Sequence, residues 1–156
     1  MFGDQDEIVI ACNTAHLLVP ELENRHGIHF TSLIECTIKH LTGRRIECVG
    51  IMASPTTLRT RLYEDDLTAS NIRVILPASK EVETIEACIR AVIRGDQVAT
   101  LQESLDVIVR NMVSRGARVV LLGCTELSVI FGKSDDPRLI DPLTIITAQL
   151  LKSKLE

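Results

Sequence analysis

The sequence predicts an α/β protein built on a parallel β-sheet. Short apolar runs rich in Val and Ile alternate with longer segments whose apolar residues recur at helical spacing, which is typical of strands joined by crossover helices. The run at residues 119–122 is apolar at every position, as expected of a strand buried on both faces. No solenoid-period repeat, low-complexity tract or flexible linker interrupts the alternation, so right-handed crossovers are expected to join the parallel strands.

The first expected element is an interior strand at residues 8–11, which are short, β-branched and apolar on both faces. Pro20 lacks an amide hydrogen and is tolerated only in the first turn of a helix. Residues 13–19 are therefore expected to form an irregular or short helical turn, and residues 20–25 a regular helix. Gly27 is expected to end that helix.

The alternation of strands and helices continues to the C-terminus. Pro55 stands at a first helical position, and Gly116 is suited to a left-handed helix cap. Asp141 is suited to N-cap the last helix, which Pro142 would open. The expected strands are 30–34 (or an extended crossover there), 45–52, 71–77, 119–122 and 139–142. The expected helices are 36–41 with a stop at Gly43, 55–63, about 82–94, about 101–112, 125–131 and the segment after 142.

Composition and charge exclude several classes of protein. The net charge of -4 and the pI near 5.6 argue against a nucleic-acid binder, and aromatic residues at 3% leave few platforms for base stacking. No apolar run approaches the roughly 18 to 20 residues that span a bilayer, and the N-terminus is acidic where a signal peptide is basic. We therefore expect a cytoplasmic protein with no nucleic-acid or membrane partner.

The chain has five cysteines, an odd number without close pairs, which fits neither a disulfide framework nor a zinc or redox motif. We therefore expect reduced thiols and no bound metal. No lysine stands in an evident cofactor site, so pyridoxal phosphate is not expected either. Cys48 and Cys88 have apolar neighbours and are expected to pack as small hydrophobic side chains.

Cys12 and Cys124 differ because each follows an apolar run and precedes small polar residues. Ligands of open α/β sheets bind beyond the carboxyl ends of the strands, and both thiols are expected there. The positive end of a following helix would lower a thiol pKa from about 8.5 toward neutrality and make a thiolate available as a base. Exposed amides and the side chains of Asn13, Thr14 and Thr125 would offer a cradle for a carboxylate.

Two motifs, in order, carry a resemblance to a known family. They are Cys12-Asn13-Thr14-Ala15-His16 and Gly123-Cys124-Thr125-Glu126, followed by Ile140-Asp141-Pro142. From about Glu7 to its C-terminus the sequence resembles the cofactor-independent aspartate/glutamate racemase superfamily. Members of that superfamily carry a Cys-Asn-Thr-Ala-His type motif in one lobe and a Gly-Cys-Thr-Glu or Gly-Cys-Thr-His type motif in the other. Glutamate racemases have histidine where Glu126 stands, so the second motif points to the aspartate racemase branch.

The resemblance implies a pseudo-symmetric two-lobe α/β fold and racemisation of an acidic amino acid, aspartate or glutamate, without metal or pyridoxal phosphate. Cys12 and Cys124 would face each other across the α-carbon, one as thiolate taking its proton and the other as thiol delivering a proton to the opposite face. The other implied roles are carboxylate binding by Asn13, Thr14, Thr125, Ser54 and Thr57, and support by His16, Glu126 and Arg94.

Family members have further strand-helix units ahead of the first cysteine motif, including an arginine for the side-chain carboxylate, where this chain has six residues. The resemblance therefore implies an incomplete first lobe in residues 1–44 and a second lobe in residues 45–137. Residues 138–156 would form a strand and helix that return to the first lobe. Such a lobe exposes a sheet edge, so a homodimer is expected.

Several roles stay open from the sequence. His16 would either tune Cys12 as an imidazolium or bind backbone carbonyls. Glu126 would raise the pKa of Cys124 by charge repulsion, unless it binds the substrate ammonium or carries the proton. Arg94 would replace the missing arginine or be a solvated charge at a helix end. Two other functions also fit the motifs: a binding remnant without activity, and a related isomerase that uses one cysteine as nucleophile.

Overall fold

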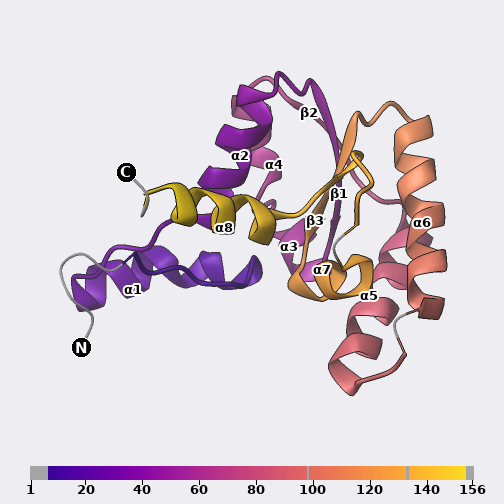
Figure 1. Ribbon diagram of the computed structural model, residues 1–156, viewed down its shortest axis with the longest axis horizontal. Helices are drawn as coiled ribbons and strands as arrows, with labels where there is room; N and C mark the ends of the chain where they lie inside the picture. Colours follow the sequence, from indigo (N-terminus) through magenta and orange to yellow (C-terminus); the bar gives the residue numbers. More distant parts are fainter. Residues whose placement is uncertain (1–6, 98, 133, 154–156) are drawn as a thin grey trace.

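A four-stranded, all-parallel β-sheet forms the centre of the protein (Figure 1). The computed structural model describes residues 7–97, 99–132 and 134–153. The sheet has the order β2-β1-β3-β4. Its strands are β1 (Cys48–Ala53), β2 (Arg73–Ile75), β3 (Val119–Gly123) and β4 (Leu139–Ile140). The predicted α/β class with a parallel sheet is therefore confirmed.

Strands β1 and β3 lie in the middle of the sheet, and every residue of both is buried, as expected of strands covered on both faces. Their parallel register sets Ala53 beside Gly123 at the carboxyl ends. Successive side chains point to opposite faces, so Leu121 and Leu122 belong to two different apolar clusters. The sheet therefore separates two cores.

Helices cover both faces of the sheet in a three-layer arrangement (Figure 1). They are η1 (Thr14–Leu18), α1 (Val19–His26), α2 (Leu33–Gly43), α3 (Pro55–Arg59), α4 (Glu64–Ala69), α5 (Ser79–Arg94), α6 (Ala99–Ser114), α7 (Thr125–Phe131) and α8 (Pro142–Ser153). One core packs α5, α6 and α7 against the strands, and the other packs α2, α3 and α4 against the opposite face. Within the described residues, no helix has both the length and the apolar character needed to cross a membrane.

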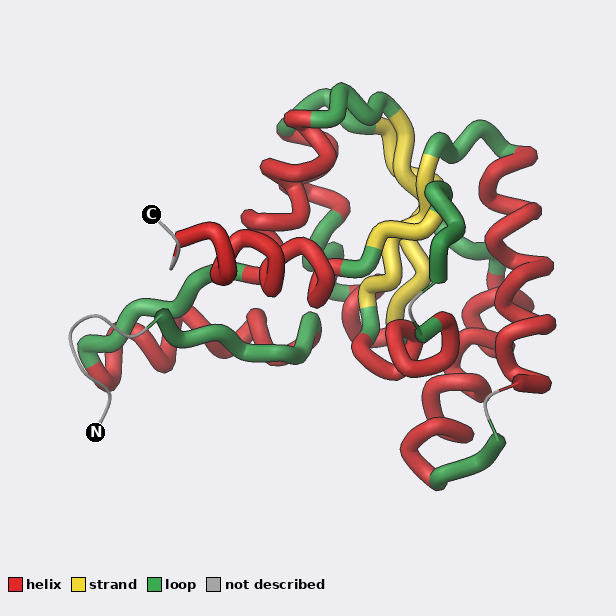
Figure 2. Tube along the Cα trace, viewed as in Figure 1, coloured by secondary structure: helices red, strands yellow, loops and turns green. Residues whose placement is uncertain are grey.

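Residues 7–26, which we call the arm, lie to one side of the sheet (Figure 1). The strand predicted at residues 8–11 is wrong, because this segment forms only one isolated parallel bridge, between Ile8 and Phe30, and Figure 2 draws residues 7–13 as loop. Val9 packs on a small cluster between α2 and α8. β-Branched residues favour a strand only where a neighbouring strand pairs with them, and none of the described residues supplies one.

The strand or extended crossover predicted at residues 30–34 is wrong beyond the bridge at Phe30, because α2 begins at Leu33. Ser32 is the N-cap, and its hydroxyl accepts a hydrogen bond from the Glu35 amide at 3.2 Å. A serine cap stabilises a helix start by about 1 kcal/mol. Ser followed by Glu three residues later is a known helix-start pattern, so the signal was present in the sequence.

The helix predicted at residues 55–63 is shorter than expected and ends at Arg59. Arg61 has a φ of 56°, in the left-handed region that breaks a right-handed helix. A further short helix, α4, then begins at Glu64 and was not predicted, although three acidic residues in its first turn favour a helix N-terminus. The turn between the two helices buries Tyr63, which is 1% exposed.

The other predicted elements overlap the observed ones, and their predicted caps are found. Gly27 and Gly116 have φ values of 62° and 103°, which glycine adopts without strain. Asp141 accepts a hydrogen bond from the amide of Leu143 at 2.9 Å, as expected of an N-cap for α8.

The last two elements join different parts of the molecule. β4 pairs with β3 and extends the sheet by one strand, while α8 contributes Ile146 to a cluster with Leu33 and Cys36 of α2. The division into lobes at residues 44 and 138 stays a prediction.

We predict that Gly123→Ala destabilises the fold. A β-carbon at this position would lie 2.9 Å from the Ala53 β-carbon and 3.3 Å from the Met52 carbonyl oxygen, and neither atom belongs to a flexible side chain. Overpacking of this kind costs about 1–3 kcal/mol, so the urea midpoint should fall. Gly43→Ala is the matched control, because no atom lies within 4 Å of its added carbon; equal stability of the two variants would contradict the prediction.

Candidate active site

Strands β1 and β3 end side by side, so the helices that follow them, α3 and α7, begin next to each other. Ala53 and Gly123 are paired, and the next residues, Ser54 and Cys124, are the N-caps of α3 and α7. Both N-caps have extended backbone. The carboxyl edge of the sheet therefore carries a hydroxyl and a thiol on neighbouring strands, where ligands of open α/β sheets bind.

The first cysteine motif lies over this edge. Thr14, which opens η1, places its hydroxyl 2.8 Å from the hydroxyl of Thr57 and 3.3 Å from that of Ser54. Ser54 and Thr57 are 3.0 Å apart, and the Ser54 hydroxyl also accepts the amide of Thr57 at 3.2 Å. Three of the predicted carboxylate-binding residues therefore form one hydroxyl cluster, although 40 or more positions separate Thr14 from the other two.

Asn13 is buried beside this cluster, and its side-chain oxygen accepts a hydrogen bond from the hydroxyl of Tyr63. Tyr63 was not among the predicted site residues. It is the single tyrosine of the chain, and it stands between two helices that the sequence did not separate. An isolated aromatic residue in an aromatic-poor sequence was the only signal available.

His16 binds backbone on both of its ring nitrogens. Its Nε2 accepts the amide of Leu33 at 3.1 Å, so Nδ1 carries the hydrogen and donates it to the carbonyl oxygen of Cys12 at 2.9 Å. The accepted amide is one of the four at the start of α2 that have no partner within the helix. Of the two roles left open for His16, the contacts observed are those of a residue that ties the arm to α2.

The thiol of Cys124 is buried and donates a hydrogen bond to the Glu126 carboxylate at 2.9 Å. Burial, followed by this carboxylate, raises the pKa of Cys124 to about 12. The expectation that the following helix lowers this pKa is wrong. Desolvation and the neighbouring negative charge raise the pKa by more than the dipole of α7, a helix of seven residues, can lower it. Cys124 is therefore a protonated thiol at neutral pH.

Glu126 gathers two donors around one carboxylate oxygen. Cys124 and the hydroxyl of Thr125, at 3.2 Å, both bond to its Oε2. Burial would raise the pKa of Glu126, but these hydrogen bonds hold it below its usual value. The carboxylate therefore stays charged and stabilises the protonated form of the thiol.

Cys12 belongs to the motif whose Thr14 contacts Ser54 and Thr57, next to the strand end that carries Cys124, and a negative charge on Cys12 would raise the pKa of Cys124 further. It is also the one exposed cysteine of the five. The fold thus brings the two motif cysteines together in unequal settings: one thiol open to solvent, the other buried and paired with a carboxylate.

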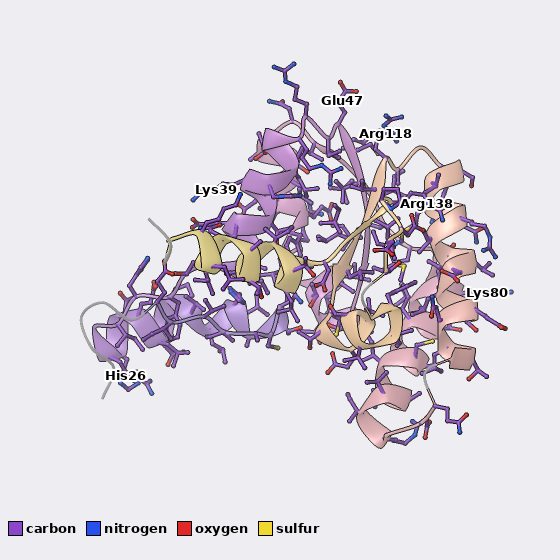
Figure 3. All side chains as sticks on the ribbon, in the orientation of Figure 1. His26, Lys39, Glu47, Lys80, Arg118 and Arg138 are labelled. Atoms are coloured by element: carbon purple, nitrogen blue, oxygen red, sulfur yellow. The ribbon has the colours of Figure 1, made fainter. Side chains whose placement is uncertain are left out.

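Several other charged side chains lie away from this edge. Figure 3 shows Glu47 and Arg118 at the end of the sheet where β1 and β3 begin, opposite α3 and α7. Arg94 is the last residue of α5 and forms an exposed ion pair with Asp96 at 2.7 Å. Among the described residues, no lysine or arginine bonds to a predicted site residue.

Two other features bear on bound groups. No cluster of three or more His, Cys, Asp or Glu able to hold a metal is found among the described residues. A cavity of about 950 Å³ opens between α2, α8 and β4, with Lys39, Arg44 and Ile140 in its walls. None of the predicted site residues lines that cavity, so it is distinct from the thiol site.

The sequence model of the Asp/Glu/Hydantoin racemase family matches residues 4–150. The chain belongs to this family. A relative in sequence, 26% identical over 110 residues, is an uncharacterized protein in the pnlA 3′ region of Pectobacterium carotovorum; the match covers 70% of this chain and 73% of that protein.

Two solved structures have a similar fold. A candidate Asp/Glu racemase from Yersinia pestis has a TM-score of 0.81 at 20% identity, and the match covers 96% of this chain and 66% of that one. The aspartate racemase of Picrophilus torridus has a TM-score of 0.77 at 24% identity, with 96% and 62% covered. The chain therefore spans less than two thirds of the length of these structures.

We predict that Glu126→Gln makes Cys124 more reactive toward iodoacetamide. The thiolate is the reactive form, and removing the carboxylate charge lowers the pKa of Cys124 from about 12. A fall of one unit in pKa raises the thiolate fraction about tenfold. The rate of Cys124 modification at pH 8 to 9, followed by peptide mass spectrometry in a Cys12→Ser background, should rise accordingly.

Glu47→Gln provides the control, because it removes an exposed carboxylate from the opposite end of the sheet. It should leave Cys124 unchanged. Equal rates in the Glu126→Gln and Glu47→Gln variants would show that Glu126 does not hold the proton on this thiol.

Proposed function

We propose that the protein is a cofactor-independent amino-acid racemase that acts on an acidic amino acid, with Cys12 and Cys124 as the two acid-base groups. The observation that carries this proposal is that Thr14, two residues after Cys12, contacts Ser54 and Thr57 at the strand end that pairs with the strand leading to Cys124. Racemisation needs a base on one face of the α-carbon and an acid on the other. Neither metal nor pyridoxal phosphate takes part.

We assign the starting acid and base from the different environments of the two thiols. Cys124 starts as the acid, because burial and Glu126 keep it protonated. Cys12 is exposed, and we assign it the removal of the α-proton as a thiolate. Cys124 then gives its proton to the opposite face, so the proton count balances and the negative charge moves from Cys12 to Cys124. The opposite enantiomer uses the same steps in reverse.

The negative charge that develops when the α-proton leaves is delocalised into the substrate carboxylate. Hydroxyl and amide donors aimed at that group stabilise the transition state more than the ground state. Thr14, Ser54 and Thr57 can each rotate a hydroxyl hydrogen toward such an anion. Asn13 and Thr125 adjoin the two cysteines and complete the set of proposed carboxylate-binding residues.

Glu126 has two uses in this scheme. Its charge attracts a substrate ammonium, and it accepts the proton of Cys124 in the free protein. An ammonium near Glu126 would neutralise part of the charge that opposes a Cys124 thiolate, so substrate binding itself would prepare the second thiol. We place the ammonium beside Glu126 for this reason.

The substrate class is proposed from the family and from the solved structures. One of these is the aspartate racemase noted above, and another is a glutamate racemase from Francisella tularensis in complex with D-glutamate, similar to this chain at a TM-score of 0.63 and 19% identity. We propose aspartate or glutamate, with the cation for the side-chain carboxylate supplied from outside the described residues. Pairing with a second copy of the chain is one source of that cation.

A second function, an isomerase that uses one cysteine as nucleophile, is favoured by one observation. Only Cys12 of the two thiols is exposed. A nucleophile must be accessible to the substrate, and it does not require a second thiol. In that case Cys124 would have a supporting role, and its removal would weaken activity without abolishing it.

We predict that Cys12→Ala and Cys124→Ala each abolish racemisation of aspartate, because each thiol serves a different face of the α-carbon. The measurement is loss of the α-proton signal of L- and D-aspartate in D2O by NMR, together with the change in optical rotation. Cys88→Ala is the matched control: this thiol is buried in the core on α5, and its removal should leave the rate unchanged.

The two proposed functions give different results. Substantial activity remaining in Cys124→Ala would exclude the two-thiol racemase and support the single nucleophile. Loss of activity in all three variants would point to a folding defect, which circular dichroism of each variant would reveal.

A further inference from the structure

Tyr63 joins two parts of the site that are far apart in the sequence. It lies in the turn between α3 and α4, is 1% exposed, and donates its hydroxyl hydrogen to the side-chain oxygen of Asn13, 50 positions earlier. Asn13 directly follows Cys12 and is itself 2% exposed. A buried phenol thus contacts the residue between the first thiol and Thr14.

The hydroxyl of Tyr63 donates its hydrogen to the side-chain oxygen of Asn13. The other hydroxyl near Tyr63 belongs to Thr37, and Thr37 donates its own hydrogen to the carbonyl oxygen of Leu33 at 2.7 Å. Burial raises the pKa of Tyr63 above its usual range, so the phenol stays protonated at every pH at which the protein would work. Asn13 therefore has a permanent donor on its oxygen.

The hydrogen bond to the side-chain oxygen of Asn13 sets the orientation of its amide group. With the oxygen held by Tyr63, the amide nitrogen must point the other way. The hydrogen bonds found among the described residues include none from this nitrogen. Its hydrogens are then available to an anion bound beside Cys12.

We propose that Tyr63 is a positioning residue that fixes the amide of Asn13 so that its N–H groups face the substrate carboxylate. This inference rests on the proposed function, because it assumes that a carboxylate binds beside the two thiols. A free asparagine amide can turn by 180° and present its oxygen, which repels an anion. If Tyr63 holds the amide in one orientation, the free-energy cost of orienting it no longer has to be met when the substrate binds.

The test is a double-mutant cycle on binding and kinetics. Tyr63→Phe removes the hydroxyl and keeps the ring, and Asn13→Ala removes the amide. We expect Tyr63→Phe to raise the dissociation constant and KM for aspartate roughly three- to tenfold, the loss expected for one oriented hydrogen bond, with a smaller effect on kcat. In the Asn13→Ala background the same change should have no further effect, because Tyr63 acts only through the amide.

Thr37→Val is the matched control. It removes the other hydroxyl near Tyr63 and leaves the bond to Asn13, so aspartate affinity should not change. A second readout needs no turnover: the side-chain NH2 signals of Asn13, identified by their absence in Asn13→Ala, should shift in Tyr63→Phe and not in Thr37→Val.

The outcomes separate this inference from the proposed function. Unchanged aspartate affinity in Tyr63→Phe, with only a lower melting temperature, would overturn it and leave Tyr63 a core residue. Independent effects of Tyr63→Phe and Asn13→Ala that multiply would overturn it as well. Aspartate binding without racemisation would contradict the racemase alone, and absence of binding by the unmodified protein would count against both.

Discussion

The parallel pairing of β1 with β3 is the interaction on which the candidate site depends. Its register places Ala53 beside Gly123, so the residues that follow, Ser54 and Cys124, emerge at one point of the sheet edge. Gly123 permits this approach, because its added β-carbon would meet Ala53 at 2.9 Å. A continuous ladder of hydrogen bonds makes the two buried strands rigid, and the groups at their ends are therefore held in fixed positions. Ser54, Thr57 and the second thiol are thereby fixed before any ligand arrives.

Burial sets the chemistry of the second thiol more strongly than its helix does. A cysteine at a helix N-terminus is commonly expected to lose its proton readily, yet α7 has only seven residues and Cys124 is shielded from water beside a carboxylate. The pKa of about 12 follows from desolvation first and Glu126 second. The helix dipole acts over its first turn and is worth up to about 2 kcal/mol in a partly buried setting, which does not offset both opposing effects.

The sequence predicted strands correctly where an apolar run is also buried in the sheet. The runs that became β1 and β3 are apolar on both faces, and the carboxyl-edge placement of Cys124 followed from them. Residues 8–11 have the same composition and form no strand, because strand formation depends on a partner that composition does not reveal. Thr14 was expected to bind a carboxylate from its place beside Cys12, whereas Ser54 and Thr57 came only from the family resemblance. Tyr63 was missed because its role depends on a left-handed turn at Arg61, which no local signal predicted.

Among the described residues, single contacts attach the arm to the rest of the protein: the bridge at Ile8, the packing of Val9, the bond of His16 to the Leu33 amide, the bonds of Glu23 to Phe30 and His29, and the contacts of Asn13 and Thr14. The candidate site is therefore half rigid sheet edge and half weakly anchored segment. Regions with few buried contacts open at lower free energy than a core. A ligand that bridges the two halves would add to the arm's attachments, so occupancy of the site and order of the arm would be thermodynamically linked.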